Sequence, residues 1–262
     1  MTDFKPVTLI TGASGGIGAA LADVFADRGH KLVLVARRAP ELKALADRIA
    51  ERGHERPSVL VVDLVRAGAA GRVADDLRDA GLEPQYVVNN AGFGLLGPAS
   101  ELDRAGQLAM VDLNVRVLTE LSLRFVESLA RRGGGILNVS SVAAFMPGPG
   151  MAVYFATKAY VLSFSAALHH ELKPLGVRVT ALCPGPVETE FQARAGMGER
   201  HFPRIFFRSP ERVAAEGYEG LMRGRRVVVP GSGNKVAALL PRLLPRSAML
   251  ALVGRVQRKN LG

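Results

Sequence analysis

The sequence is poor in cysteine and contains no tryptophan. Its one thiol, Cys183, excludes a disulfide within the chain. No run of about 18 uninterrupted apolar residues occurs, so no membrane-spanning helix is predicted. Residues 1–6 show no basic stretch followed by an apolar one. We therefore expect no secretion signal and a cytoplasmic location.

Acidic residues are scarce at one end of the chain. Residues 1–200 contain 22 Lys and Arg against 21 Asp and Glu, whereas residues 201–262 contain 12 against 3. Nearly all of the net charge of +10 therefore lies in the last quarter. A phosphorylated cofactor, an acidic carrier or an anionic membrane surface would fit this excess, and so would a role in solubility alone.

Short apolar runs alternate with segments of helical period. Strands are predicted at residues 7–11, 31–36, 58–62, 86–89, 135–140, 177–183 and 226–229, and helices at residues 17–28, 40–52, 69–80, 102–131 and 153–172. This alternation predicts an α/β fold, a doubly wound parallel sheet of about seven strands with helices on both faces. No linker-like stretch interrupts it, so residues 1–262 are predicted to form a single domain.

A glycine-rich turn joins the first predicted strand to the first helix. Gly12, Gly16 and Gly18 follow Thr11 within eight residues. Glycines allow a tight turn and a close approach of the backbone to a pyrophosphate, which the helix N-terminus also attracts. The spacing differs from the commonest dinucleotide fingerprint, so tight packing without a ligand is the alternative.

The second predicted strand ends in two arginines, Arg37 and Arg38. An NAD site usually carries Asp or Glu at this distance from the glycine turn, where it binds the ribose 2′-hydroxyl. Guanidinium groups instead bind a 2′-phosphate through paired hydrogen bonds. The pattern predicts NADP(H) in preference to NAD(H), with a solvated arginine pair as the alternative.

Three polar residues gather around the fifth predicted strand. Tyr154 and Lys158 stand four apart in a predicted helix and so share a face. Ser141 follows the strand, and ligands bind at the carboxyl ends of parallel strands. The following helix could bring Tyr154 beside Ser141. Taken singly, each residue also fits an ordinary structural role.

Together these residues resemble the short-chain dehydrogenase/reductase family, over about residues 7–191. The matching motifs are Thr11-Gly12-x-x-x-Gly16-x-Gly18, Asp63 after the third strand, Asn89-Asn90-Ala91-Gly92, Asn114, Ser141, Tyr154-x-x-x-Lys158 and Pro184-Gly185. The resemblance implies a Rossmann-like fold and an NADP(H)-dependent oxidoreductase that interconverts a ketone and a secondary alcohol. It also implies a homodimer or homotetramer, without a metal ion or nucleic acid.

The resemblance implies a role for each matched catalytic position. Tyr154 would be the general acid, and Lys158 would ease its proton loss and hold the nicotinamide ribose. Ser141 would bind the substrate carbonyl, and Asn114 would support a water that relays protons through Lys158. The cofactor would be lined by Gly12, Ser14, Gly16, Ile17, Gly18, Arg37, Arg38, Asp63, Leu64, Asn90, Ala91, Gly92, Tyr154, Lys158, Pro184, Gly185, Val187 and Thr189.

One position departs from the family pattern. Many NADP-using members carry Lys or Arg just before the second glycine of the turn, where this chain has Gly15. The phosphate preference is therefore assigned to Arg37, together with Arg38 and Ser14.

Apolar residues gather at residues 190–210, which the resemblance identifies as a substrate lid. The lid holds Phe191, Met197, Phe202, Ile205, Phe206 and Phe207, and the loop before Tyr154 adds Phe145, Met146, Pro147, Pro149 and Met151. They predict an apolar substrate, such as a fatty acyl, steroid or other lipid-like ketone, with core packing as the alternative. Basic residues interleave with them and fit either a phosphate of coenzyme A, an acidic carrier or a solvated face; these are Arg194, Arg200, Arg204 and Arg208.

Two other functions fit the same motifs. One is a steroid or polyol alcohol dehydrogenase of the same family. The other is a non-catalytic NADP-binding protein, against which the four intact catalytic positions argue.

Residues 232–262 form a basic, amphipathic C-terminal extension beyond these motifs. Residues 235–262 hold six basic residues and no acidic one, with aliphatic residues between them. Pro241 and Pro245 predict short helical pieces. Such segments often lie in a membrane interface. The alternative is packing on the parent domain or on a second subunit, extending the lid or a dimer contact.

Overall fold

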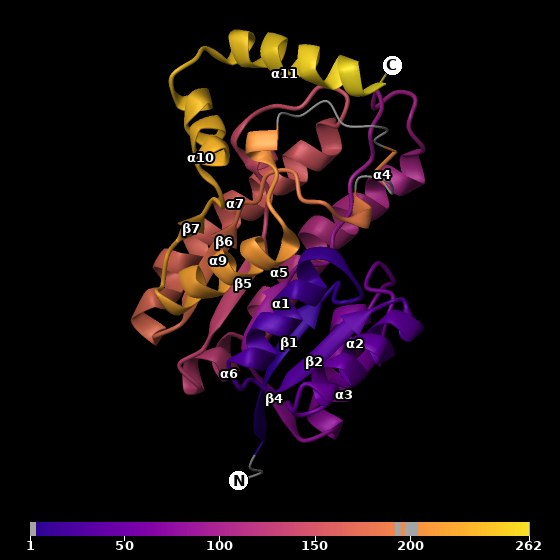
Figure 1. The fold of residues 1–262 in the computed structure, drawn as a ribbon, viewed down its shortest axis with the longest axis vertical. Helices are drawn as coiled ribbons and strands as arrows, with labels where there is room; N and C mark the ends of the chain where they lie inside the picture. Colours follow the sequence, from indigo (N-terminus) through magenta and orange to yellow (C-terminus); the bar gives the residue numbers. More distant parts are fainter. Residues whose placement is uncertain (1–3, 192–194, 197–203, 262) are drawn as a thin grey trace.

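The computed structural model describes residues 4–191, 195–196 and 204–261, without the side chains of residues 242, 246 and 257–261 (Figure 1). The described strands form one sheet of seven, ordered β3-β2-β1-β4-β5-β6-β7, and every neighbouring pair is parallel. The predicted doubly wound sheet is thereby confirmed. The strands are β1 Lys5–Thr11, β2 Leu32–Ala36, β3 Ser58–Val61, β4 Leu82–Asn89, β5 Gly135–Val139, β6 Arg178–Leu182 and β7 Val227–Val228.

Helices cover both faces of the sheet because successive strand residues point to opposite sides. Ile10 of β1 joins a core with α1 Gly16–Asp27, α2 Ala39–Glu51 and α9 Pro210–Met222. Its neighbour Leu9 joins the core on the other face. The helices of that second face are α3 Ala69–Asp79, α5 Leu118–Arg124, α6 Val126–Arg131 and α7 Ala152–Leu172, followed by the short turn η3 Lys173–Leu175.

The strand order opens a crevice in the middle of the sheet. From β1 the chain builds outward to β2 and β3, then returns to place β4 on the other side of β1. The loops after β1 and β4 therefore leave in opposite directions, and ligands bind at such a switch point. Gly12 and Asn90 lie there, directly after the two strands.

The predicted helix at 102–131 is wrong as a single helix. It consists of α4 Arg104–Val111, a π-helical turn η1 Asp112–Val117, α5 and α6, with α5 and α6 separated at Phe125. A π-helical turn carries an extra residue, which shifts the faces of the helix and is frequent at functional sites. Hydrophobic periodicity does not reveal such a shift, and Asn114 lies inside it.

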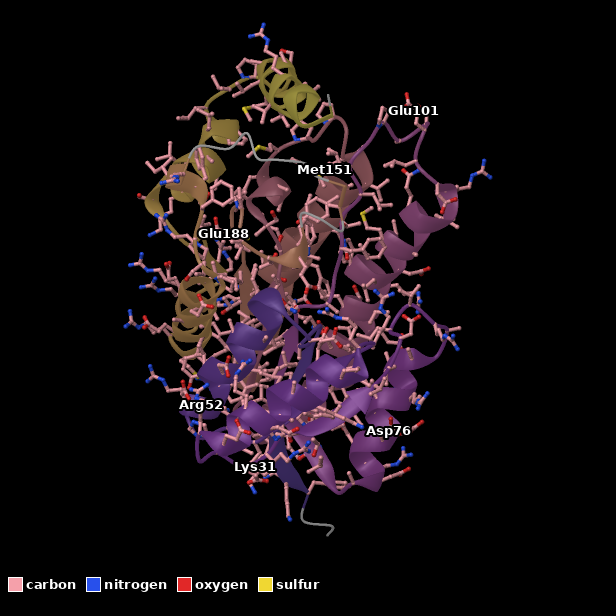
Figure 2. All side chains as sticks on the ribbon, turned by 45° about the vertical axis from the view of Figure 1, so that its right-hand side comes forward. Lys31, Arg52, Asp76, Glu101, Met151 and Glu188 are labelled. Atoms are coloured by element: carbon pink, nitrogen blue, oxygen red, sulfur yellow. The ribbon has the colours of Figure 1, made fainter. Side chains whose placement is uncertain are left out.

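The C-terminal extension lies across the end of the molecule opposite to the N-terminus (Figure 1). It comprises α10 Ser232–Leu239, η5 Leu240–Arg242 and α11 Arg246–Leu261, interrupted near both prolines as predicted. Met249 and Val253, one turn apart on α11, are buried against Phe155 and Met151. Figure 2 shows Met151 at this end of the molecule and Lys31 at the other. The extension therefore packs on its own domain.

Candidate active site and cofactor site

The glycine turn after β1 is tightly enclosed. Gly12 and Gly16 adopt positive φ angles of 66° and 54°, a region that favours glycine. A Cβ atom on Gly12 would lie 2.8 Å from the Cα atom of Ala91, and one on Gly18 would lie 2.3 Å from the carbonyl oxygen of Gly12. The turn thus brings bare backbone and the N-terminus of α1 to the wall of a cavity, an arrangement that suits a phosphate group.

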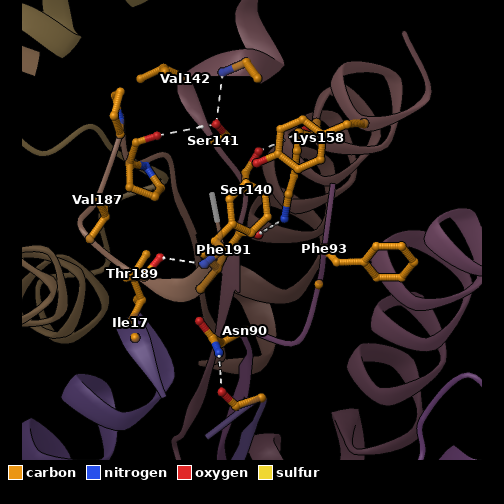
Figure 3. Close-up of a pocket in the computed structure, with 18 of the residues that line it drawn as sticks. Ile17, Asn90, Phe93, Ser140, Ser141, Val142, Lys158, Val187, Thr189 and Phe191 are labelled. Carbon is orange, nitrogen blue, oxygen red and sulfur yellow. Dashed lines mark hydrogen bonds between the residues drawn. The ribbon is translucent and has the colours of Figure 1, made fainter. Parts of the chain in front are cut away.

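Two side chains fasten the turn to the end of β4. The hydroxyl of Thr11 accepts hydrogen bonds from the backbone N–H groups of Asn90 and Ala91, each at 3.1 Å. The side-chain amide of Asn90 donates back to the carbonyl oxygen of Thr11 at 3.0 Å. It also donates to the carbonyl oxygen of Gly12 at 3.1 Å (Figure 3). Asn90 therefore lines the cavity and also holds the turn in shape, a role that its motif position did not reveal.

The two arginines after β2 differ in their surroundings, although both line the cavity. Arg38 donates from Nε to the hydroxyl of Ser14 at 3.2 Å and from a second nitrogen to its carbonyl oxygen at 3.0 Å. It also forms ion pairs with Glu41 and Glu190, both at 3.0 Å. Arg37 is exposed and makes no hydrogen bond or ion pair within the described part of the chain.

The remaining predicted cofactor positions also surround the cavity. Asp63, whose carboxylate accepts a hydrogen bond from the N–H of Val65 at 3.3 Å, lies at its edge with the buried Leu64. The side chain of Thr189 lies against the glycine turn, since a Cβ atom on Gly16 would fall 3.0 Å from its Cγ2. Among the other predicted cofactor positions, the following line the cavity: Gly12, Ser14, Gly16, Ile17, Ala91, Gly92, Pro184, Gly185 and Val187. Gly18, which was also expected to line the cofactor, is the exception: it does not line the cavity and is enclosed behind the turn by Gly12 and Asn90.

Tyr154 and Lys158 face the same cavity from one side of α7. The Nζ atom of Lys158 lies 5.8 Å from the centre of the Tyr154 ring and donates to the carbonyl oxygen of Val139 at 2.9 Å. Burial lowers the pKa of Lys158 to about 8. Burial also raises the pKa of Tyr154 to about 12, which a hydrogen bond with Ser141 offsets in part. Burial thus dominates, and the phenol of Tyr154 is neutral near pH 7.

Ser141 stands at the end of β5, where a short turn, η2 Val142–Phe145, begins. Its hydroxyl accepts from the N–H of Ala143 at 3.1 Å and donates to the carbonyl oxygen of Pro184 at 3.5 Å (Figure 3). The hydroxyl therefore joins the end of β5 to the loop after β6. It also lies beside the phenol of Tyr154, as the spacing of the two residues predicted.

Asn114 reaches the site from the π-helical turn. It is 1% exposed, and its amide exchanges two hydrogen bonds with the backbone of Phe93, at 3.1 and 2.9 Å, while also donating to Thr157 on α7. A Cβ atom on Gly92 would lie 2.8 Å from the Oδ1 atom of Asn114 and 3.5 Å from the Nζ atom of Lys158. Both polar atoms therefore face the same space beside Gly92.

Beyond Tyr154 the cavity, of about 820 Å³, becomes apolar. Of the expected substrate residues, Met146, Met151, Phe191 and Phe206 line it, whereas Ile205 is 58% exposed. Residues 197 and 202 of the expected lid, and the basic residues 194 and 200, lie outside the described residues. The C-terminal extension supplies a further wall, in agreement with the alternative in which it packs on the parent domain and extends the lid; this wall is made of Ala237, Leu240, Met249, Leu252, Val253 and Val256.

Sequence reasoning also missed Asn234, at the start of α10. It is 1% exposed, lines the cavity, and donates to the carbonyl oxygens of Phe206 at 3.0 Å and Pro230 at 2.8 Å. A Cβ atom on Gly185 would fall 2.2 Å from its Oδ1 atom. Asn234 therefore connects the lid turn η4 Arg204–Phe206 to the loop after β6. One asparagine in a basic, apolar tail gives no signal of this role.

A glycine turn at a topological switch point, with a buried tyrosine and lysine beside it, defines a dinucleotide-dependent oxidoreductase. A sequence model of the short chain dehydrogenase family matches residues 6–199. The chain belongs to the short-chain dehydrogenase/reductase family, whose members are oxidoreductases that act on alcohol and carbonyl groups.

Related proteins match most of this chain. A sulfoacetaldehyde reductase of Chromohalobacter salexigens is 37% identical over 213 residues, which cover 80% of this chain and 84% of the relative. A short-chain dehydrogenase from Sphingobium yanoikuyae, solved in complex with NADPH, is 34% identical with a TM-score of 0.80, covering 94% of this chain and 96% of that one. A bulky-bulky ketone specific alcohol dehydrogenase from Comamonas testosteroni is 32% identical with a TM-score of 0.75, covering 91% and 93%.

Proposed function

We propose that this protein uses NADPH to reduce a bulky, apolar ketone to a secondary alcohol. The observation that carries the proposal is the continuity of the cavity, which runs from the glycine turn, past Tyr154, to the aliphatic wall of α11. A dinucleotide at one end and an apolar ketone at the other would meet at the tyrosine. Ligand sites of this kind are mostly apolar, with a few polar groups that fix orientation.

The cofactor end fits a phosphorylated dinucleotide. A Cβ atom on Gly12 or Gly16 would press against Ala91 or Thr189, so the turn keeps bare backbone at the cavity wall. The end of β2 carries no acid to bind a free ribose 2′-hydroxyl. Arg37, exposed at the cavity and unpaired among the described residues, is free to meet a 2′-phosphate. The Sphingobium yanoikuyae relative binds NADPH. A bound nicotinamide would supply the hydride.

The chain's own residues would supply the proton and the orientation. The phenol of Tyr154 is neutral near pH 7, so it can donate its proton to the carbonyl oxygen of the ketone. The Ser141 hydroxyl beside it would hold that oxygen in place. Lys158 and Asn114 border one small space beside Gly92, through which a water could return a proton to the site.

The apolar wall favours a bulky ketone over a polyol. Leu240, Met249, Val253 and Val256 offer no hydrogen-bond partner to the several hydroxyl groups of a polyol. The Comamonas testosteroni relative is described as specific for bulky-bulky ketones, which agrees with this preference. A steroid-like ketone belongs to the same class of substrate.

A homo-oligomer in the cytoplasm is part of the same proposal. Leu108 of α4, Leu123 of α5 and Tyr160 of α7 are 59%, 52% and 40% exposed, and such apolar side chains on neighbouring helices suit a contact between subunits. Cys183 is fully buried and unpaired, as in proteins of a reducing compartment.

A ketone panel assayed with NADPH and NADH tests the proposal. We expect loss of the reduced-nicotinamide absorbance with bulky apolar ketones, at a kcat/KM that rises about fourfold for each buried methylene group. Hydroxylated ketones of equal size serve as the matched control and should react poorly. Equal rates for both series, or no reaction with any ketone, would contradict the proposed substrate class.

A further inference from the structure

The C-terminal extension presents an aliphatic stripe on its outer side. Val236, Leu239 and Leu243 follow one another at helical spacing and are 66%, 53% and 79% exposed. None of the three lines the cavity, whereas Leu240 between them does. The segment therefore has two apolar sides, of which only the inner one is covered by the domain. Contiguous exposed aliphatic side chains mark a surface that meets a partner.

The sequence on both sides of the stripe carries charge of one sign. Glu219 is the last acidic residue of the chain, and residues 220–262 contain nine Lys and Arg. Lys235, directly before Val236 on α10, and Arg255 on α11 are both exposed. A second copy packed on this face about a two-fold axis would bring these positive charges together, which is unfavourable. The positive charge of this segment therefore favours an anionic partner.

The residue types of the stripe favour a lipid surface over a protein as its partner. No aromatic residue follows Tyr218, and Leu and Val supply the exposed apolar side chains. Protein interfaces are enriched in aromatic residues at their centres, whereas basic segments with an aliphatic face lie in the headgroup region of a bilayer.

We propose that the outer side of the C-terminal extension docks on an anionic lipid surface. The aliphatic stripe enters the boundary between headgroups and acyl chains, and the basic residues approach the anionic headgroups. No helix within the described residues is long and apolar enough to span a membrane, so the contact is peripheral.

The stripe lies near an opening of the cavity, so docking through it would place that opening at the lipid surface. Leu252 lines the cavity and is 42% exposed, so the cavity reaches the surface at α11. Docking through α10 and α11 brings this opening to the lipid, where apolar molecules concentrate. The docking itself does not depend on which reaction the site performs.

Co-sedimentation of the full chain with vesicles tests the proposal. We expect binding at low salt to phosphatidylcholine vesicles that contain phosphatidylglycerol, little binding to phosphatidylcholine alone, and release at high salt. Lys235→Glu combined with Arg255→Glu should lower the partition coefficient at least fivefold for each residue. Leu239→Glu combined with Leu243→Glu should abolish binding. Leu175→Glu, at a leucine of η3 with 52% exposure, is the matched control and should bind normally.

Three results would overturn the proposal. The first is wild-type protein that stays in the supernatant with anionic vesicles at low salt. The second is a change from dimer to monomer caused by Leu239→Glu and Leu243→Glu, because a second copy would then cover the stripe. The third concerns polyglutamate added as a competitor of the vesicles. If wild type and the Leu239→Glu and Leu243→Glu variant bound polyglutamate equally, the partner of this surface would be an acidic protein. Binding is measured without substrate, so failure of the proposed reaction leaves the test intact.

Discussion

The two ends of the cavity are built in different ways. The cofactor end consists largely of backbone, held by Gly12, Gly16 and the hydrogen bonds between Thr11 and Asn90. The substrate end consists of apolar side chains brought from the loop before α7, the lid and α11, which are far apart in the chain. Backbone recognition requires particular residues at fixed spacing, whereas an apolar wall accepts any side chains of suitable volume. The reaction class is therefore much easier to infer than the substrate.

Tyr154 lies where the two ends meet, and its replacement should have the largest effect. Tyr154→Phe keeps the ring and removes the hydroxyl, so we expect kcat to fall by about 10²- to 10⁴-fold with NADPH affinity largely unchanged. Steady-state kinetics and a fluorescence titration with NADPH measure the two quantities. Tyr160→Phe, six residues later on α7 and 40% exposed, is the control and should retain activity. A Tyr154→Phe enzyme with more than about half of the wild-type activity would show that another group donates the proton.

Replacement of Lys158 tests whether its burial, beside Tyr154 at the meeting point of the two ends of the cavity, lowers the stability of the fold. Its pKa is about 8 in the folded chain against 10.5 as the ordinary value, so burial of the charge destabilises the fold below pH 8. The penalty is about 3 kcal/mol, and it disappears as pH rises from 8 to 10.5. Lys158→Met should therefore be inactive but more stable than wild type at pH 7, with the difference narrowing toward pH 10.5. Chemical denaturation at several pH values measures the free energy of unfolding of the two proteins. If the difference between them did not change with pH, burial of the Lys158 charge would not be its cause.

The two arginines at the cofactor end are expected to have different roles. Arg37→Ala should weaken NADPH by about 10- to 150-fold and NADH little, because a charge-assisted contact to the 2′-phosphate is lost. Arg38→Ala should weaken both cofactors alike, since Arg38 holds Ser14 and so the turn that both share. Titration of each variant with the two cofactors separates the roles. Equal losses of NADPH and NADH in Arg37→Ala would place phosphate recognition elsewhere.

Substitutions at the substrate end should change kcat/KM for the ketone without changing the affinity for NADPH. Leu252 and Leu250 are neighbours on α11 with similar exposure, 42% and 45%, but only Leu252 lines the cavity. Leu252→Asp should lower kcat/KM for a bulky apolar ketone about tenfold, or about 1.4 kcal/mol, with NADPH affinity unchanged. Leu250→Asp should leave both unchanged. The same loss in both variants would mean that α11 acts through stability and not through contact with substrate.

The parallel sheet was predictable because each buried strand is an apolar run and each helix keeps its period. Gly12, Asp63 and Asn90, which the resemblance assigns to the cofactor, line one cavity because the ends of parallel strands meet at one edge of the sheet. The π-helical turn at Asn114 was not predictable, because the extra residue shifts the helix faces within one six-residue stretch, which is too short for the hydrophobic period to show the shift. The anchoring of Arg38 to Ser14 depends on side-chain geometry that two adjacent arginines do not reveal.

Residues close in sequence carried the chemistry of this protein. The glycine turn, the Tyr154 and Lys158 pair and the arginines after β2 each span one turn or one strand end. Together they carry the resemblance to the family, and that resemblance implies a dinucleotide and a proton donor. The size and polarity of the substrate space depended on packing across the whole chain. Met249 and Val253 became a cavity wall only because α11 folds back over the start of α7, where Phe155 lies more than 90 residues earlier in the chain. Apolar side chains pack without directional bonds, so an amphipathic sequence leaves its partner open until the tertiary fold supplies one.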